Sequence, residues 1–443
     1  MQEEHSKIDE HELLNKRSQQ LIKFFTKRPS LAGFFLMLVT LFVGVIIRIQ
    51  NLPLLKDITT NKYIPLALDP FVFLRYAEYI ATHGSLFLVD KMRNFPLGYN
   101  LSHMPTFTSF FLVYLYKIIK IFIPEITLQK VDVIYPVIAF VLFALFFYLL
   151  IKRLFNWKVA LVSTLFITLL PTFLYRTMCG FSDHDVLSMV FWMASFYAFV
   201  IGWQSKKTWV AVLMGLLSGV LVGYHGLTAG NVKFSLIIIG TFALIEILFN
   251  KFSKKDFYLY SCWVISSFFI LGMLTGKFNG LAGLATSFTS GIALLAFLAG
   301  LVDYFIFKLD ILKIKKKITG KYPLGLVSFA VVFVLAFLGA IIALGPSFLI
   351  DQLTHIYQSL LFALGTTRWA LTVAENHQPF FTDWIAQLTW VYLLLFMGGS
   401  IWLFYEMLSH TRKKYRFKAL YSIQYSLQLL YLAGITANQY LTV

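Results

Sequence analysis

Residues 132–151 read DVIYPVIAFVLFALFFYLLI, an apolar run long enough to cross a lipid bilayer as a helix. Its one charged residue, Asp132, stands at the start, and Lys152 and Arg153 follow directly after its end. Basic residues just beyond a spanning helix are typical of the cytoplasmic side of a membrane. The stretch therefore predicts a transmembrane helix, and similar runs recur along most of the chain.

The overall composition agrees with a membrane protein. Of the 443 residues, 58% are hydrophobic and only 13% are charged. The net charge of +17 lies in short clusters between apolar runs, which favours cytoplasmic loops and argues against a nucleic-acid partner. The chain has only two cysteines, Cys179 and Cys262, without the spacing of metal ligands. This number excludes a framework of structural disulfides.

The hydropathy pattern predicts an all-α, polytopic membrane fold with a cytoplasmic N-terminus. Residues 106–123 are apolar too, but two lysines interrupt them, so we interpret them as an amphipathic helix on the outer surface, with a re-entrant segment as the alternative. Residues 1–30 are interpreted as a cytoplasmic amphipathic tail. The predicted spans are 31–49, 132–151, 159–175, 187–203, 209–224, 231–249, 257–275, 281–307, 323–349, 387–407 and 419–441.

This topology places three acidic clusters on the extracytoplasmic face, in the outer loops 50–131, 176–186 and 350–386. They are Asp69 in ALDPFVFLR, Asp183 and Asp185 in GFSDHDVL, and Glu375 in TVAENHQP. Carboxylates beside a membrane are costly to bury and usually mark functional sites. Carboxylate oxygens that converge from separate segments are the ligands that hard divalent cations prefer. The pattern predicts one metal-centred site.

Each acidic residue also has a purely structural interpretation. Asp69 could cap a helix with Pro70 in its first turn, and Asp183 or Asp185 could cap a helix that begins near Val186. Glu375 could be a solvated loop residue. His184, between the two aspartates, is expected to be a neighbour of the metal site rather than a ligand.

The flanking sequences narrow these alternatives. The chain carries LDPFVFLRYAEYI followed by NFPLGYN, then LYRTMCGFSDHDVLSM, and then TVAENHQP. In this order, the motifs resemble those of the catalytic subunit of oligosaccharyltransferases, the STT3/AglB/PglB family, and most closely its archaeal members. The resemblance runs from about residue 30 to the C-terminus. It implies a GT-C-type transmembrane catalytic domain over residues 31–443, with 11 to 13 spans.

The resemblance also implies an activity. The family transfers a glycan from a polyprenyl (dolichyl) phosphate or pyrophosphate to Asn of Asn-x-Ser/Thr sequons. Asp69, Asp183 and Asp185 would hold Mn²⁺ or Mg²⁺, and Asp69 and Glu375 would be the catalytic residues. The expected partners are a lipid-linked oligosaccharide, an acceptor polypeptide and membrane lipid, on the outer face of an archaeal cell membrane. The residues expected to bind substrate are Arg75, Arg176, Arg368, Thr372 and His377.

The chain departs from the family pattern at its C-terminal end. The string WWD of the family's C-terminal soluble domain is absent, so no C-terminal globular domain is expected. The alternatives are a natural minimal form, a truncated form, or one half of a split enzyme in which a separate chain would supply sequon recognition. Asn438 occupies the place of the arginine with which the family holds the lipid phosphate. Another cation, such as Arg176, Arg368 or Arg75, would then bind that phosphate.

Three other functions remain open on the sequence. An inactive or partner-dependent homologue would bind glycolipid without chemistry, in keeping with the missing sequon-reading motif. Another polyprenyl-linked GT-C glycosyltransferase would share the acidic outer loop but is not expected to carry TVAENHQP. A transporter would place its carboxylates within broken helices near the middle of the membrane, not in outer loops.

Overall fold

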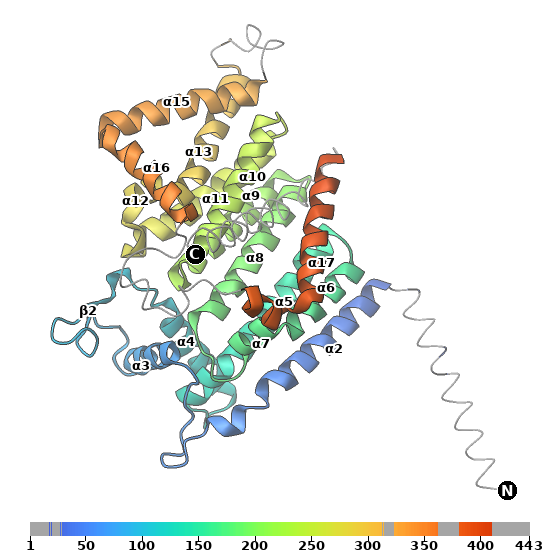
Figure 1. Ribbon diagram of the computed structural model, residues 1–443, viewed down its shortest axis with the longest axis vertical. Coiled ribbons are helices and arrows are strands. Elements are labelled where there is room, and N and C mark those ends of the chain that lie inside the picture. The colour runs from blue at the N-terminus through green and yellow to red at the C-terminus, as the bar shows by residue number, and fades with distance from the viewer. Residues whose placement is uncertain are drawn as a thin grey trace.

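The computed structural model describes residues 17, 19, 27, 29–311, 313, 323–361 and 381–409, and these are almost entirely helical (Figure 1). Seven of the described helices are long and apolar enough to cross a membrane, and a bent pair would make an eighth. The predicted all-α, polytopic membrane fold is confirmed. The seven are α2 (Pro29–Ile49), α5 (Leu128–Leu154), α8 (His184–Gln204), α9 (Thr208–Thr228), α11 (Lys254–Met273), α13 (Phe288–Val302) with the π-helical η4 (Asp303–Lys308), and α15 (Leu324–Leu344).

Several predicted spans are not single straight helices. The span expected at 159–175 consists of α6 (Trp157–Leu169) and α7 (Pro171–Thr177), which meet at an angle of 68°. Leu170 between them is extended, because a proline disfavours helical backbone in the residue before it. The bend directs the C-terminal turn of α7, and Arg176 with it, towards the start of α8.

The later spans also differ from the prediction. The expected run 281–307 divides at Ser287 into α12 (Gly280–Thr286) and α13. The run 323–349 ends at Leu344, where Gly345 with a φ of 84° separates α15 from α16 (Pro346–Leu361). A glycine adopts this conformation without the strain that a side chain would add. α10 (Val232–Leu248) has only 17 residues, and α17 (Phe381–Ser409) is kinked at Thr389. The last predicted span, 419–441, lies outside the described residues.

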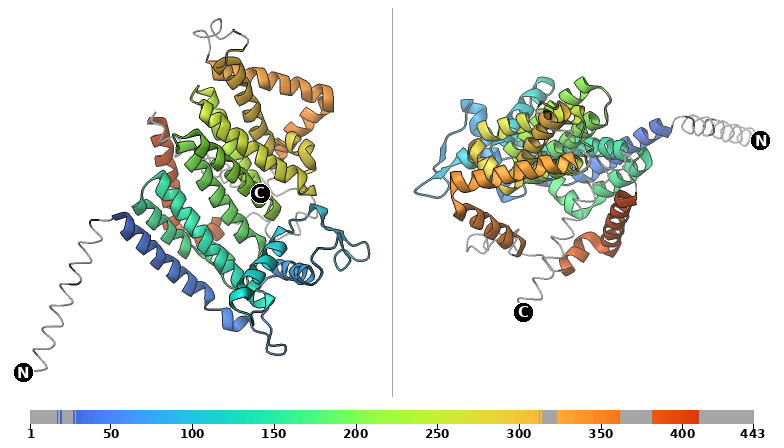
Figure 2. Two further views of the ribbon diagram at one scale, coloured as in Figure 1. Left: turned by 180° about the vertical axis from the view of Figure 1, so that it is seen from behind. Right: turned by 90° about the horizontal axis from the view of Figure 1, so that it is seen from above.

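The first outer loop forms a small structure at one end of the bundle (Figure 2). Its parts are η1 (Leu52–Leu55), α3 (Leu68–His83), β1 (Val89–Asp90), β2 (Tyr99–Asn100), η2 (Leu101–His103) and α4 (Phe107–Phe122). The strands pair antiparallel. The helix predicted at 106–123 is present as α4, which buries Leu112 and Val113 and leaves Ile121 and Phe122 exposed. Its position relative to the lipid surface stays a prediction.

Basic loops meet at the opposite end of the bundle, which we call the basic end. Arg153, after α5, donates a hydrogen bond of 2.8 Å to Gln204 at the end of α8. Lys255, before α11, donates to the carbonyls of Trp203 and Ser205. Three of the loops that carry predicted basic clusters, those after α5, after α8 and before α11, thus lie together. The assignment of this end to the cytoplasm, and of residues 1–30 to a tail there, stays a prediction.

α9 and α11 pack backbone against backbone through glycines of α9. A Cβ on Gly215 would lie 2.4 Å from the carbonyl oxygen of Leu259, and one on Gly219 would lie 2.4 Å from that of Trp263. Neither distance is possible for a real side chain, so only glycine fits. Such small residues let membrane helices approach closely and gain van der Waals contact. We call this contact the glycine seam, and it fixes α9 relative to α11.

Candidate active site

Asp183 and Asp185 lie at the N-terminus of α8, at the end of the bundle that carries the first outer loop, which we call the acidic end. Asp183 is the N-cap residue, and its Oδ1 accepts a hydrogen bond of 2.6 Å from the backbone N–H of His184. Asp185 lies in the first turn. The capping role is therefore confirmed for Asp183, in a helix that begins two residues before Val186. A carboxylate is favoured here because the N-terminal end of a helix is electropositive.

The imidazole of His184 lies between the two aspartates. Its Nδ1 is 2.6 Å from Asp183 Oδ1, and its Nε2 is 3.7 Å from Asp185 Oδ1. The ring packs edge to face on Phe73 of α3, with 5.4 Å between ring centroids. His184 is thus held by both carboxylates and by α3. Its expected role as a neighbour of a metal site stays a prediction.

Arg176 at the end of α7 supplies a second cation to Asp183. Its Nη1 is 3.8 Å from Asp183 Oδ2, and its guanidinium lies 4.9 Å from the ring centroid of Phe181. Burial alone would raise the pKa of the Asp183 carboxyl, but the hydrogen bond and charge of His184 and the charge of Arg176 outweigh it and lower this pKa. Asp183 is therefore ionised at neutral pH.

Asp69 reaches the same region from the first turn of α3. The predicted N-cap role is wrong, because Ala67 is the N-cap and Asp69 and Pro70 are the second and third residues of the helix. Proline is tolerated there because the first backbone N–H groups of a helix have no partner within it. Asp69 and Asp183 both lie close enough to Asp185 for their charges to act on its carboxylate. Acidic clusters more than 100 residues apart in sequence therefore come together.

The chemistry of these side chains fits a hard divalent cation, since all three predicted ligands offer carboxylate oxygens. Their arrangement is less complete. Within the described ranges, no three His, Cys, Asp or Glu side chains converge closely enough to hold a metal ion. One oxygen of Asp183 contacts His184 and the other faces Arg176. The remaining predicted site residues, Arg368, Thr372, Glu375 and His377, lie outside the described residues.

Arg75, also predicted to bind substrate, lies on a different face of α3 from Phe73, which contacts His184. It forms an ion pair with Asp90, which also accepts a hydrogen bond of 2.8 Å from the Tyr76 hydroxyl. Burial would raise the pKa of Asp90, but the hydrogen bonds from Arg75 and Tyr76 prevail and lower it. The charge of Arg75 is thus balanced within the first outer loop.

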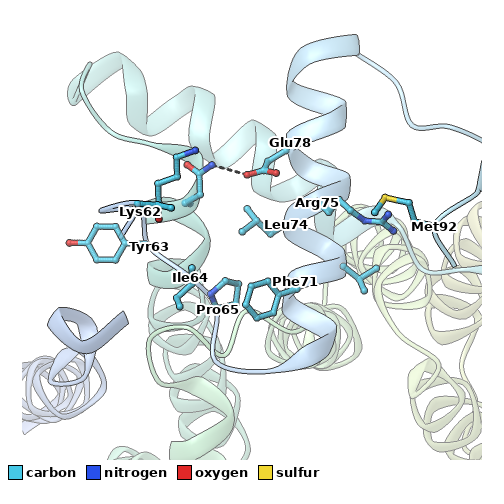
Figure 3. Close-up of a pocket in the computed structure, with 12 residues that line it drawn as sticks. Lys62, Tyr63, Ile64, Pro65, Phe71, Leu74, Arg75, Glu78 and Met92 are labelled. Atoms are coloured by element: carbon cyan, nitrogen blue, oxygen red, sulfur yellow. Dashed lines mark hydrogen bonds between the residues drawn. The ribbon is translucent and has the colours of Figure 1, made fainter. Parts of the chain in front are cut away.

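A cavity of about 510 Å³ opens on this face of α3 (Figure 3). Phe71, Leu74 and Arg75 line it from α3, at helical spacing, whereas Phe73 faces His184 on the other side. Glu78 accepts a hydrogen bond of 2.7 Å from Gln129 across one wall. α3 therefore separates this cavity from His184 and the acidic motif.

The structure adds residues that the sequence interpretation missed. The Tyr135 hydroxyl donates to the backbone carbonyl of Asp183, and Ser182 Oγ donates to Asp132 Oδ2 over 2.8 Å. Both bonds hold the loop before α8 against the N-terminal part of α5. A sequence signal existed for Asp132, because a carboxylate that opens an otherwise apolar span is unusual.

A chain of hydrogen bonds also joins α8 to α9 and α10. Ser188 Oγ donates to the Asp185 carbonyl over 2.7 Å and accepts from Asn231 Nδ2 over 3.2 Å. The Asn231 Oδ1 in turn lies 2.7 Å from His225 Nε2. The start of α10 and the end of α9 are therefore tied to the acidic motif.

Comparison with known families identifies one that covers nearly the whole chain. The family described as "Oligosaccharyl transferase STT3, N-terminal" matches residues 35–443. One curated relative, dolichyl-phosphooligosaccharide-protein glycotransferase 2 of Archaeoglobus fulgidus, is 26% identical over 152 residues, which are 34% of this chain and 24% of that protein.

Solved structures with the same fold include oligosaccharyltransferases of Archaeoglobus fulgidus. AglB in complex with an inhibitory peptide and a dolichol-phosphate superposes with a TM-score of 0.69 and 17% identity, over 94% of this chain and 50% of AglB. A complex with Zn and sulfate gives a TM-score of 0.63 and 18% identity, over 91% of this chain and 48% of the other. The chain thus spans about half the length of these solved relatives.

Proposed function

Since the chain belongs to the STT3 family of oligosaccharyltransferases, we propose that it transfers a glycan from a polyprenyl (dolichyl) phosphate or pyrophosphate to Asn of an Asn-x-Ser/Thr sequon. One observation carries the proposal. Asp69 and the Asp183–His184–Asp185 motif, which come from separate outer segments, lie together at the acidic end of a membrane-spanning bundle.

The reaction needs carboxylates because an amide nitrogen is a weak nucleophile. Its lone pair is delocalised into the carbonyl group, so the group must be twisted or polarised before it attacks. Asp69 and Glu375 would accept hydrogen bonds from the two N–H groups of the acceptor amide. These bonds would favour a twisted amide, in which the lone pair is localised on nitrogen. Holding the acceptor beside the donor would lower the barrier further, because it removes the entropy cost of the encounter.

A metal ion is part of the proposal. Asp69, Asp183 and Asp185 would hold Mn²⁺ or Mg²⁺, and such an ion, when bound, would neutralise charge on the departing phosphate. The arrangement around Asp183 supports a role for positive charge, because His184 and Arg176 both stabilise its ionised form. A solved structure with the same fold is a complex with Zn and sulfate.

The proposed partners follow from the same reasoning. A lipid-linked oligosaccharide would keep its tail in the membrane and present its phosphate at the acidic end, which we assign to the extracytoplasmic face. The related AglB complex contains both a peptide and a dolichol-phosphate. Recognition of the sequon by a separate chain also belongs to the proposal.

A second candidate is a partner-dependent or inactive homologue that binds the glycolipid without transfer. It is favoured by the incomplete convergence of metal ligands in the described part of the chain. Another GT-C glycosyltransferase would transfer to a hydroxyl group instead. The acceptor used in the assay separates these possibilities.

The test is transfer of labelled glycan from a host lipid extract to a fluorescent Asn-x-Thr peptide, with Mn²⁺ and then with EDTA. We expect a metal-dependent mobility shift that disappears with Asp69→Asn and with a Gln-x-Thr peptide. Asp57→Asn is the matched control, because the Asp57 carboxylate belongs to the same outer loop and, among the described residues, accepts its hydrogen bonds from Thr59 and Thr60. Undiminished transfer by Asp69→Asn would contradict the proposed site. Glycolipid binding without transfer would support the partner-dependent homologue.

A further inference from the structure

Lys277 lies in the turn after α11, in the short helix η3 (Gly276–Phe278) at the acidic end. The turn is held against the first outer loop, because His103 Nδ1 lies 3.0 Å from the Gly276 carbonyl oxygen. A Cβ on Gly276 would come within 2.9 Å of the Ser102 carbonyl oxygen. The backbone that carries Lys277 is therefore fixed by close contact on that side.

The ammonium group of Lys277 points across to the turn between α9 and α10. Its Nζ lies 3.6 Å from the position that a Cβ would take on Gly230. Lys233, on the first turn of α10, is close enough for its positive charge to act on Lys277. Two lysines from different segments thus create a positive region over the Gly230 turn.

This region adjoins the acidic motif. Asn231, which follows Gly230, is hydrogen-bonded to Ser188, and Ser188 is bonded to the backbone of Asp185. Lys277 is close enough for its positive charge to act on the imidazole rings of His184 and His225. The lysines therefore lie beside the proposed reaction centre, on its α9–α10 side.

Lys277 differs from the arginines that the sequence favoured for phosphate binding. Arg176 faces Asp183, and Arg75 is paired with Asp90. Lys277 is half-buried, yet it has no carboxylate partner among the residues that the structure describes. Burial first, and the charge of Lys233 second, lower the pKa of Lys277 to about 8. A half-buried cation without a counter-ion is unfavourable, and an anionic ligand would relieve it.

We propose that Lys277, assisted by Lys233, binds the phosphate group of the polyprenyl carrier. This inference rests on the proposed function and names the cation that would hold its donor. Ammonium groups form strong, charge-assisted hydrogen bonds to phosphate oxygens. The sequence comparison places Asn438 where the family is expected to have a phosphate-binding arginine. Lys277 would supply a cation in its stead.

The first experiment measures binding of dolichyl monophosphate to the full chain in detergent, by native mass spectrometry. Lys277→Gln should weaken binding by about tenfold or more, because a charged hydrogen-bond donor is lost. Lys277→Arg should restore most of the affinity. Lys91→Gln is the matched control, since Lys91 is an exposed lysine of the first outer loop, and it should bind like the wild type. Dolichol, which lacks the phosphate, should bind all four proteins equally.

The second experiment uses the wild-type protein and so does not depend on the folding of a variant. Acetylation of Lys277 by an amine-reactive reagent is followed by peptide mass spectrometry. Dolichyl monophosphate should protect Lys277, whereas dolichol should not. Protection by inorganic phosphate at the same concentration would contradict a lipid ligand, and absence of protection by dolichyl monophosphate would overturn the inference.

The two proposals fail in different ways. Binding that depends on Lys277 in a protein that transfers no glycan would support this inference and count against the proposed activity. Transfer with an unchanged KM for the lipid donor in Lys277→Gln would support the activity and overturn the role of Lys277.

Discussion

The two ends of the helix bundle use charged side chains differently. At the basic end, cations bind backbone carbonyls and nearby side chains of other loops, as Lys255 does with Trp203 and Ser205 and Lys308 with Phe252 and Asp303. At the acidic end, Asp69 and Asp183 both place negative charge near the Asp185 carboxylate, and Lys277 has no carboxylate partner within the described ranges. The contacts at the basic end connect neighbouring loops, whereas the acidic end leaves charge available for a ligand.

The difference shows that charge at a membrane surface is not informative by itself. Lysines are far more numerous than aspartates in this chain, and Lys255 and Lys308 at the basic end contribute to loop packing. Like charges held together without full compensation cost stability, and such sites are common where a protein binds or reacts. Substitutions at matched positions on the two ends test this distinction.

The largest effect on glycan transfer is expected when a carboxylate is removed from the acidic end. Removal of a carboxylate from the basic end is the matched comparison. Asp185→Asn should lower transfer by about a hundredfold or more, since a residue at the reaction centre is lost. Its thermal unfolding temperature should not fall, because the change relieves repulsion. Asp303→Asn, which breaks an ion pair of 2.7 Å with Lys308, should leave transfer within about twofold. Equal losses of transfer in both variants would remove the distinction between the ends.

The second effect concerns loop closure at the basic end. Lys255→Met should reduce the free energy of unfolding by about 1 to 3 kcal/mol, because buried carbonyls lose a charged donor. Thermal unfolding in detergent would measure this change, and the rate of glycan transfer should remain that of the wild type. A variant with normal stability and impaired transfer would show that the basic end takes part in the function.

The third effect is a pH dependence of lipid-phosphate binding. Lys277, with a pKa of about 8, loses its proton as the pH rises, so affinity for dolichyl monophosphate should fall about tenfold between pH 7 and pH 9. Among the described residues, the titratable groups electrostatically coupled to this lysine are Lys233, His184 and His225, and the imidazole of His103 contacts the same turn. The Lys277→Gln variant should show a flatter profile above pH 8. Profiles of equal slope would assign the dependence to another group.

The smallest effect is expected at a single exposed contact. Arg153→Gln removes the hydrogen bond to Gln204 at the basic end. Such surface contacts contribute about 1 kcal/mol or less, so the thermal unfolding temperature should change by only a few degrees. A much larger loss would indicate that this loop contact supports the whole bundle.

Much of the architecture could be predicted from the sequence, because spanning helices need long apolar runs and their loops carry asymmetric charge. The exceptions depend on local backbone chemistry. Pro171 bends the third span, and Gly345 ends another, although hydropathy continues through both. Averaged hydropathy does not register a single residue that changes the direction of the chain.

The candidate site was predicted only in part. Motifs indicated Asp69, Asp183 and Asp185, and the structure brings them to one end of the bundle. The N-cap assignment of Asp69 was wrong because the helix begins one residue before it. Lys277 had no recognisable motif, since its place depends on the contact between Gly276 and His103, 173 residues apart in the chain. Only tertiary packing reveals such a residue.

The glycine seam has a consequence for the cost of ligand binding. α9 ends beside His225 and the Gly230 turn, while α11 leads directly into the turn of Lys277. With the two backbones in contact, these groups are positioned when the bundle assembles. The loss of conformational entropy then occurs during folding, and little further ordering is required when a lipid arrives. A preformed site of this kind can bind a polyprenyl phosphate through its phosphate group alone, without contacts to the flexible tail in the bilayer.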